Sequence, residues 1–207
     1  GRQMITAGID IGSISSKAAL IRDGEVIGTM VRPSGYDSSA VGRQIFEALL
    51  EDKGIQASAV DAVVSTGYGR ANIEFADRAM TEIICHGAGA YFLNPGVRGI
   101  IDVGGQDSKA ILLGKTGKVE NFAMNDKCAA GTGRFMEVMA AALEVELNQM
   151  GEVSLQSASP VKISSICTVF AESEVISMIA RREKREDIIA GIHQSAAARV
   201  AILARKI

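Results

Sequence analysis

The chain has 207 residues, which is enough for one large domain or two small ones around a real hydrophobic core. Its hydrophobic content of 47% and charged content of 22% are ordinary for a soluble globular protein, and a net charge of -2 gives no reason to expect nucleic acid or an anionic membrane surface as a partner. No apolar run approaches the roughly 18–20 residues of a membrane helix. The N-terminus lacks a signal-peptide pattern, and the three cysteines form no CxxC pair. We therefore expect a cytoplasmic protein that contacts neither membrane nor nucleic acid.

The first thirty residues predict three strands joined by tight turns. Residues 4–12 (MITAGIDIG) form an apolar run that ends in Asp10 and Gly12. Residues 15–31 (SSKAALIRDGEVIGTMV) predict a hairpin that turns at Asp23-Gly24.

A helix, a strand and a second helix are expected next. Residues 39–54 (SAVGRQIFEALLEDKG) predict an amphipathic helix closed by Gly54. Residues 60–70 (VDAVVSTGYGR) predict a strand that runs into a glycine turn. Residues 82–96 (EIICHGAGAYFLNPG) predict a helix that stops before Pro95.

The opening pattern then returns. Residues 97–105 (VRGIIDVGG) end an apolar run in Asp102 and Gly104, and residues 108–124 predict a hairpin that turns near Gly117. Asp102 follows Asp10 by 92 positions, and each D-x-G signal is followed by Ser-Lys-Ala. This repetition indicates two related subdomains.

The remainder of the chain predicts helices. The segment after 125–135 (NDKCAAGTGRF) has apolar residues at helical spacing, as do residues 168–182 and 185–207. The last segment carries no C-terminal cap, so we expect that a C-terminal segment is missing.

Both turns have the chemistry of a phosphate-binding loop. Glycine lets the backbone approach an oxyanion closely, and successive N–H groups form an anion-binding nest. An aspartate at the strand end can hold Mg²⁺. Two such turns facing each other would grip a nucleoside triphosphate between subdomains, and no Walker-type P-loop motif occurs. The candidate nucleotide-binding residues are Gly12, Ser13, Ile14, Ser15, Ser16 and Lys17 in the first turn and Gly104, Gly105, Gln106, Asp107, Ser108 and Lys109 in the second.

The alternative interpretation is that each D-x-G merely ends a strand, and that Lys17 or Lys109 is only a solvated hairpin charge. The paired motifs nevertheless resemble the two phosphate loops of the actin, Hsp70 and sugar-kinase ATPase superfamily, and "STGYGR" (65–70) resembles the connecting segment of that fold. The resemblance implies an α/β protein of two related ribonuclease H-like subdomains. We expect them at 1–95 and 96–207, the second carrying two notable cysteines and incomplete at its C-terminus.

Cys128 and Cys167 each precede a predicted helix, and we expect both thiols at helix N-termini, where the backbone dipole favours thiolate. Two thiolates cannot complete a four-cysteine site, but a two-fold dimer supplies four. A [4Fe–4S] cluster, a dimer-bridging zinc and two structural cysteines all remain open on this reasoning. Cys85 is expected to be a small apolar residue of its helix.

Four segments resemble the activator proteins of 2-hydroxyacyl-CoA dehydratases, which share a family with the ATPase subunits of benzoyl-CoA reductase. They are NDKCAAGTGRF (125–135), CTVFAESEVIS (167–177), DIIAGIH (187–193) and DVGGQDSK (102–109). The resemblance implies that Cys128 and Cys167 bind one [4Fe–4S] cluster across a homodimer.

The resemblance also implies an ATP-driven electron transfer. Reduced ferredoxin or flavodoxin would supply one electron, and the dehydratase, or a related acyl-CoA reductase, would receive it. Asp10 and Asp102 are the expected Mg²⁺ and water organisers, and Gln106 is expected to position the attacking water. Residues Gly131, Thr132 and Gly133 would contact the nucleotide and link its site to Cys128.

Three points stay open in the sequence. Glu172 and Glu174 are expected to complement a helix dipole, with a contact to the nucleotide ribose as the less favoured role. The rival functions are the ATPase subunit of a benzoyl-CoA-type reductase and a cluster-free small-molecule kinase or ATPase of the same superfamily. A nucleotide-sensing module that hydrolyses nothing is a third class.

Overall fold

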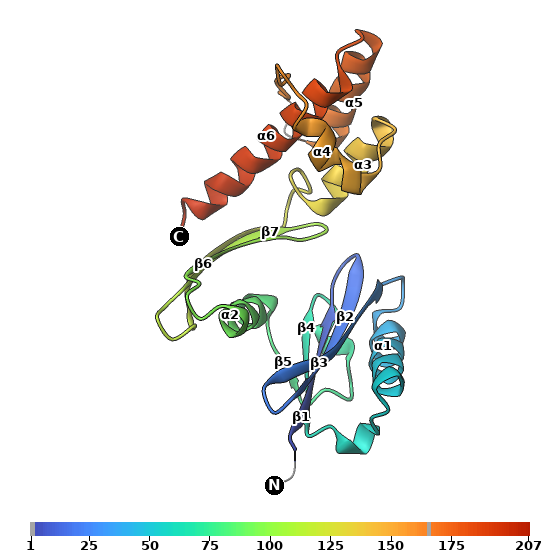
Figure 1. Ribbon diagram of the computed structural model, residues 1–207, viewed down its shortest axis with the longest axis vertical. Helices are drawn as coiled ribbons and strands as arrows, with labels where there is room; N and C mark the ends of the chain where they lie inside the picture. The colour runs from blue at the N-terminus through green and yellow to red at the C-terminus, as the bar shows by residue number, and fades with distance from the viewer. Residues whose placement is uncertain (1–2, 165–166) are drawn as a thin grey trace. The chain divides into compact units, whose positions relative to one another are not determined.

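The computed structural model describes residues 3–164 and 167–207, which fold as two compact units, Gly1–Pro95 (unit 1) and Gly96–Ile207 (unit 2). Each unit pairs one β-sheet with helices (Figure 1). Within these ranges, no helix combines the length and the apolar character needed to cross a membrane.

Unit 1 is built on a five-stranded sheet. Its strands are β1 (Ile5–Ile11), β2 (Ser15–Arg22), β3 (Glu25–Pro33), β4 (Ala62–Gly67) and β5 (Arg78–Ala79). The spatial order is β3-β2-β1-β4-β5, in which β1, β2 and β3 are antiparallel neighbours and β4 runs parallel to β1 and β5. The predicted hairpin turn has positive φ at both Asp23 and Gly24, as a tight two-residue turn requires.

Helix α1 (Ser38–Lys53) covers one face of this sheet. Asp37 caps its first turn by accepting a hydrogen bond from the N–H of Ala40, and Gly54 ends it in the left-handed conformation at φ 63°. The core between helix and sheet is apolar and buried. Its largest fully buried members are Ile9, Ile11, Leu20, Ile45 and Leu49.

Alternation along β1 has a direct consequence for the site. Ile9 and Ile11 point into the core, so Asp10 points to the opposite face of the sheet. Helix α2 (Glu82–Leu93) follows β5, and short 3₁₀ turns lie at Ala57–Ala59 and Arg70–Asn72.

Unit 2 contains a three-stranded antiparallel sheet in the order β6-β7-β8. Its strands are β6 (Gly99–Val103), β7 (Ser108–Leu113) and β8 (Val119–Asn125). The central strand β7 is almost wholly buried, and Gly117 forms the predicted turn before β8 with φ 76°.

Unit 2 also carries four helices that pack on one another, and the last of them, α6, connects them to strands β7 and β8 (Figure 1). The helices are α3 (Gly133–Ala142), α4 (Met150–Ser154), α5 (Thr168–Ala180) and α6 (Arg185–Ala204), with a 3₁₀ turn at Leu147–Gln149. Phe135 and Met139 of α3, Val175 of α5 and Ile188 and Ile192 of α6 meet in one buried cluster.

A glycine allows α6 to approach the chain segment before α5. A Cβ atom on Gly191 would collide with the carbonyl oxygen of Val161, which is backbone and cannot rotate away. The same segment is tied to the start of α6 by Asp187, whose carboxylate accepts hydrogen bonds from the Ser157 hydroxyl (2.6 Å) and the Ser159 N–H (3.1 Å). These bonds lower the pKa of Asp187.

Gly191→Ala is therefore expected to lower the free energy of unfolding by about 1–3 kcal/mol, because the added methyl forces the backbone apart. Gly151→Ala on α4 is the matched control, since a Cβ there meets nothing within 4 Å. It should raise stability by roughly 0.5 kcal/mol through the lost flexibility of glycine. Urea denaturation followed by far-ultraviolet circular dichroism measures both. Equal effects of the two substitutions would contradict the packing argument.

Candidate functional site

The turn between β1 and β2 is closed by backbone and side-chain contacts. The N–H of Gly12 donates to the carbonyl of Ser15 at 3.1 Å. Lys17 reaches back over the turn, donating to the same carbonyl at 3.1 Å and pairing with the Asp10 carboxylate at 3.2 Å. A Cβ on Gly12 would lie 2.7 Å from that carbonyl, so only glycine fits the turn in this form.

Ser34, which sequence reasoning did not identify, directly follows β3 and braces the first turn. Its hydroxyl donates to the carbonyl of Gly12 at 2.6 Å, and its N–H donates to the carbonyl of Ile14 at 2.9 Å. The hydroxyl of Ser16 is fully buried against that of Ser34 at 2.8 Å. Ser16 therefore contributes its side chain to the architecture of the turn. Nothing in the sequence around Ser34 signals this contact, because it joins residues 22 positions apart.

The predicted connecting segment lies directly beside Asp10. Gly67 has φ +85°, and a Cβ there would collide with the Asp10 carboxylate and the carbonyl of Ile11. The N–H of Gly69 donates to that same carbonyl at 3.0 Å. The glycines of "STGYGR" thus let β4 close against the end of β1.

The turn between β6 and β7 repeats this geometry. The N–H of Gly104 donates to the carbonyl of Asp107 at 2.9 Å. Lys109 pairs with Asp102 at 3.2 Å and with Asp107 at 2.8 Å. The strand registers also match, because Asp10 faces Lys17 across β1 and β2 as Asp102 faces Lys109 across β6 and β7. The corresponding residues of the two turns are 92 positions apart.

The two lysines differ in exposure. The Lys17 side chain is 42% exposed and has one carboxylate partner, whereas that of Lys109 is 4% exposed between two. Burial by itself would lower the pKa of Lys109, but the hydrogen bond and charge of Asp107, followed by the charge of Asp102, raise the pKa above its ordinary value. Lys109 therefore stays charged through the neutral range, and on the alkaline side its ion pairs are lost as the pH rises through that raised pKa. This geometry favours Lys17 over Lys109 for direct contact with a phosphate.

Helix α3 begins on the second turn. The N–H groups of Gly133 and Arg134 donate to the carbonyls of Gly104 and Gly105, each at 2.9 Å. A Cβ on Gly133 would lie 3.4 Å from the Gly104 carbonyl oxygen, so the approach is close. The structure thus joins two groups of predicted site residues that are far apart in the sequence.

The loop before α3 is also internally bonded. Gly131 has φ +85°, and Thr132 is fully buried with both its N–H and its hydroxyl donating to the carbonyl of Ala129. The side chain of Asn125 donates to the carbonyl of Cys128 at 3.3 Å.

The prediction for the cysteines is half right. Cys167 is the N-cap of α5, and it is exposed. Cys128 is half-buried and precedes the 129–132 turn, whose last residue, Thr132, is the N-cap of α3, so its thiol is not at the helix N-terminus. The helix begins five residues after Cys128 because the 129–132 segment is used to close a hydrogen-bonded turn. Cys85 is half-buried on α2, in unit 1.

Glu174 holds the segment that leads to Cys167. Its carboxylate accepts hydrogen bonds from the N–H of Ser164 at 3.0 and 3.1 Å and from the Ser164 hydroxyl at 2.9 Å. The sequence offered a dipole role or a ribose contact for this residue, and the structure assigns it a third role. Only the spacing of Ser164 before the helix could have suggested it.

Cys128 and Cys167 suit a shared metal centre in several respects. Both belong to unit 2, and α3 and α5 pack against each other in its core, with Cys128 at the edge of that core. Helix α5 has no acidic residue in its first turn, so no carboxylate there opposes a thiolate at its N-cap, Cys167. In residues 3–164 and 167–207, no group of three or more His, Cys, Asp or Glu side chains is placed to hold a metal within one copy of the chain. A four-thiolate site therefore needs a second copy.

The remaining predicted residues line the turns themselves. Ser13 is exposed, Ile14, Gly105 and Asp102 are half-buried, and Gln106 is exposed at the tip of the second turn. Gln106 thus has the accessibility that contact with a water molecule requires.

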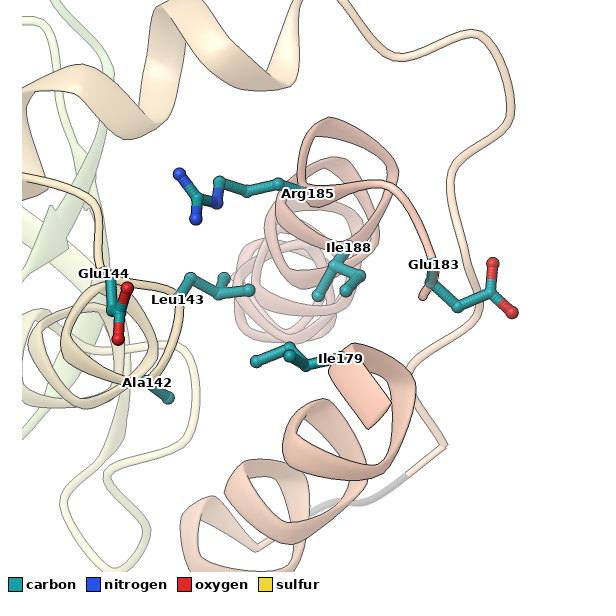
Figure 2. Close-up of a pocket in the computed structure, with 7 residues that line it drawn as sticks. All are labelled: Ala142, Leu143, Glu144, Ile179, Glu183, Arg185 and Ile188. Atoms are coloured by element: carbon teal, nitrogen blue, oxygen red, sulfur yellow. The ribbon is translucent and has the colours of Figure 1, made fainter. Parts of the chain in front are cut away.

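A cavity of about 280 Å³ lies elsewhere in unit 2, between the ends of α3 and α5 and the start of α6. Leu143, Ile179 and Ile188 point into it, and Arg185 and Glu144 lie at its rim (Figure 2). It is at the opposite end of α5 from Cys167, and none of the predicted site residues lines it.

Comparisons with solved structures confirm the predicted fold. The (R)-2-hydroxyglutaryl-CoA dehydratase component A of Acidaminococcus fermentans superposes with a TM-score of 0.93 at 44% identity, over 99% of this chain and 79% of that one. The activator of the 2-hydroxyisocaproyl-CoA dehydratase from Clostridium difficile with bound ADPNP gives 0.90 at 44% identity, over 98% and 76%. The fold is that of the actin, Hsp70 and sugar-kinase ATPases.

Proteins of similar sequence include an activator of an acyl-CoA dehydratase and a subunit of an acyl-CoA reductase. The activator of lactoyl-CoA dehydratase of Anaerotignum propionicum is 49% identical over 97% of this chain and 78% of its own length. One of the subunits of benzoyl-CoA reductase from Thauera aromatica is 36% identical over 98% and 73%. The model of the BadF/BadG/BcrA/BcrD ATPase family matches residues 7–207. The chain, with its paired turns and its two cysteine segments, therefore belongs to the BadF/BadG/BcrA/BcrD ATPase family.

Proposed function

We propose that the chain is an ATP-hydrolysing activator of a 2-hydroxyacyl-CoA dehydratase, in which hydrolysis drives one-electron transfer to the dehydratase. The observation that carries the proposal is the pair of hydrogen bonds from Gly133 and Arg134 to Gly104 and Gly105. They connect a phosphate-type turn to the helix that follows Cys128. A nucleotide-binding event and a thiolate-bound group would therefore share one structural element.

In this proposal the two turns together would supply the groups that a magnesium nucleotide requires. Asp10 and Asp102 end their strands with half-buried carboxylates, which suits Mg²⁺ because it prefers one or two carboxylates together with phosphate oxygens. Gly12 and Gly104 would let the backbone of the two turns approach phosphate oxygens closely, because glycine carries no Cβ atom. Lys17, the more exposed lysine, would then exchange its contact with Asp10 for one with a phosphate.

The reaction is hydrolysis of the terminal phosphoanhydride. A water oxygen bonds to the γ-phosphorus, the bond from that phosphorus to the bridging oxygen breaks, ADP leaves with the bonding electrons, and the water's proton passes to solvent or phosphate. Asp10 and Asp102 would order the magnesium and the water, and Gln106 would orient the water from the tip of its turn. Lys109 would keep Asp102 and Asp107 in place through its buried ion pairs.

Cys128 and Cys167 would hold the electron-transfer group with the same residues of a second copy. A [4Fe–4S] cluster bound there would supply one-electron transfer, with reduced ferredoxin or flavodoxin as donor and the dehydratase as acceptor. The exposed apolar side chains next to Cys167 support a homodimer. Val169, Phe170 and Ile176 are 65%, 67% and 54% exposed on α5, and apolar groups around a thiolate pair are what an interface would cover.

The second candidate is the ATPase subunit of a benzoyl-CoA-type reductase, which the similarity to the Thauera aromatica protein supports. The identity to the dehydratase activators is higher, at 46% and 49% against 36%. We therefore place the dehydratase activator first. Both candidates use the same turns and cysteines.

Asp10→Asn and Asp102→Asn are each expected to lower the kcat for ATP hydrolysis about 10²-fold, because each removes a charge that holds the metal and the water. Phosphate release under saturating Mg²⁺ and ATP measures the effect. Asp52→Asn, an exposed carboxylate on α1, is the control and should leave the rate unchanged. Retention of more than half of the activity in either variant would rule out the assigned role.

Cys128→Ser and Cys167→Ser should each abolish iron and sulfide binding by anaerobically purified protein, because removing one residue from a symmetric dimer removes two of four thiolates. Iron and acid-labile sulfide per dimer are the measured quantities. Cys85→Ser, in the other unit, should keep the full complement. Wild-type protein that takes up no iron would favour a cluster-free ATPase. Wild-type protein that contains zinc and no iron would favour a structural zinc ion bridging the dimer.

Gly133→Val should separate the two activities. The larger side chain presses on Gly104 and Gly105 and loosens the link from the turn to α3, so nucleotide should no longer alter the surroundings of the cysteines. The measurement compares the rate at which bathophenanthroline removes iron in the presence of MgATP and of MgADP. The wild type should show a difference of several fold and the variant none, although the variant still hydrolyses ATP. A variant that hydrolyses ATP and keeps the full difference would refute the link.

A further inference from the structure

Thr66, the second residue of "STGYGR", has a buried hydroxyl for which the structure shows no hydrogen-bond partner. The residue is 9% exposed, and its Oγ1 atom is inaccessible to solvent. A buried hydroxyl without a partner is unfavourable, and a valine of nearly the same shape would fill the position better. Its presence is therefore explained better by function than by folding.

Nearby buried hydroxyl groups are all used. Ser65 donates to the carbonyl of Arg70 at 2.8 Å, and Ser16 and Ser34 bond to each other. Among the buried serines and threonines of residues 3–95, Thr66 alone has an unpaired hydroxyl. The exception lies beside the proposed magnesium site.

Strand register places Thr66 next to Asp10. In the parallel pairing of β1 and β4, Thr66 is the partner of Asp10, and in the antiparallel pairing of β1 and β2, Lys17 is. Directly paired residues present their side chains on the same face, so Lys17, Asp10 and Thr66 form a row across three strands. Within this row, Lys17 on β2 forms an ion pair with the Asp10 carboxylate, and Thr66 is the neighbour of Asp10 on β4.

We propose that Thr66 is a positioning residue of the magnesium–nucleotide site, whose hydroxyl donates to the Asp10 carboxylate once that carboxylate has turned from Lys17 toward magnesium. A carboxylate that binds a metal through one oxygen is fixed by a hydrogen bond to the other. The unpaired donor is then an arrangement prepared for the loaded state. This inference rests on the proposed function, because it requires magnesium and nucleotide at Asp10.

The test compares Thr66→Val and Thr66→Ser in the whole protein, with MgADP as the ligand. Thr66→Val should raise the Tm of the nucleotide-free protein by about 2–4 °C, because it removes an unpaired buried hydroxyl. It should also weaken ADP binding in the presence of Mg²⁺ about tenfold, the loss expected for one hydrogen bond to a charged group. ADP binding in EDTA should not change, and Thr66→Ser should bind MgADP within about twofold of the wild type.

Two further variants isolate the contact with Asp10. Thr6→Val makes the same chemical change on the same face of the sheet but opposite Ala62, so it should leave MgADP binding unchanged. In an Asp10→Asn background, Thr66→Val should cause no additional loss, because the hydroxyl acts through the carboxylate.

Thr66→Val protein that binds MgADP as tightly as the wild type would overturn the inference, as would a full additional loss in the Asp10→Asn background. A fall in the Tm of the nucleotide-free Thr66→Val variant would do so too, because the hydroxyl would then have a partner without ligand. Wild-type protein that binds no MgADP would instead refute the proposed function, and this inference with it.

Discussion

The salt bridge between a lysine and the aspartate opposite it on the neighbouring strand organises both halves of the chain. Lys17 and Asp10 in unit 1, and Lys109 and Asp102 in unit 2, hold a glycine turn closed at the same register and the same distance of 3.2 Å. An unpaired carboxylate at a strand end would be solvated and mobile, whereas a paired one keeps its direction. The two turns differ in burial, so the exposed Lys17 can exchange its partner more readily than the buried Lys109.

The second turn extends this order into the helices. Its two carbonyls accept hydrogen bonds from the start of α3, so a shift of the turn displaces a helix rather than a single side chain. Glu174 performs the corresponding task for α5 by binding Ser164 ahead of Cys167. Each of the two cysteine segments is therefore attached to a packed element of unit 2, which is what the proposed electron-transfer group would require of its ligands.

Local sequence patterns predicted the longer strands, the hairpins and the longer helices, because alternation, turn glycines and caps such as Gly54 act within a few residues. The two-residue strand β5 and the five-residue helix α4 were not predicted, because they are too short to show a period. The repeat at 92 positions predicted the matching turns. Sequence patterns could not predict the features that depend on long-range contacts. These are the hydrogen bond from Ser34 to Gly12, the hydrogen bonds from Gly133 and Arg134 to the second turn, and the unpaired hydroxyl of Thr66. Cys128 was expected at the N-terminus of the helix, but the 129–132 segment forms a separate turn closed on Ala129 and keeps the cysteine away from it.

The anchoring of the Cys167 segment limits how this protein can be rebuilt. Asp187 fixes the segment through Ser157 and Ser159, and Glu174 fixes it again at Ser164. A designer who grafts this cysteine segment onto another scaffold must also carry over the first two turns of α5, which include Glu174, and the first turn of α6, which includes Asp187. The smallest transferable unit is the segment together with Glu174 and Asp187, the two carboxylates that hold it. A shorter graft would carry the cysteine without the contacts that orient its segment.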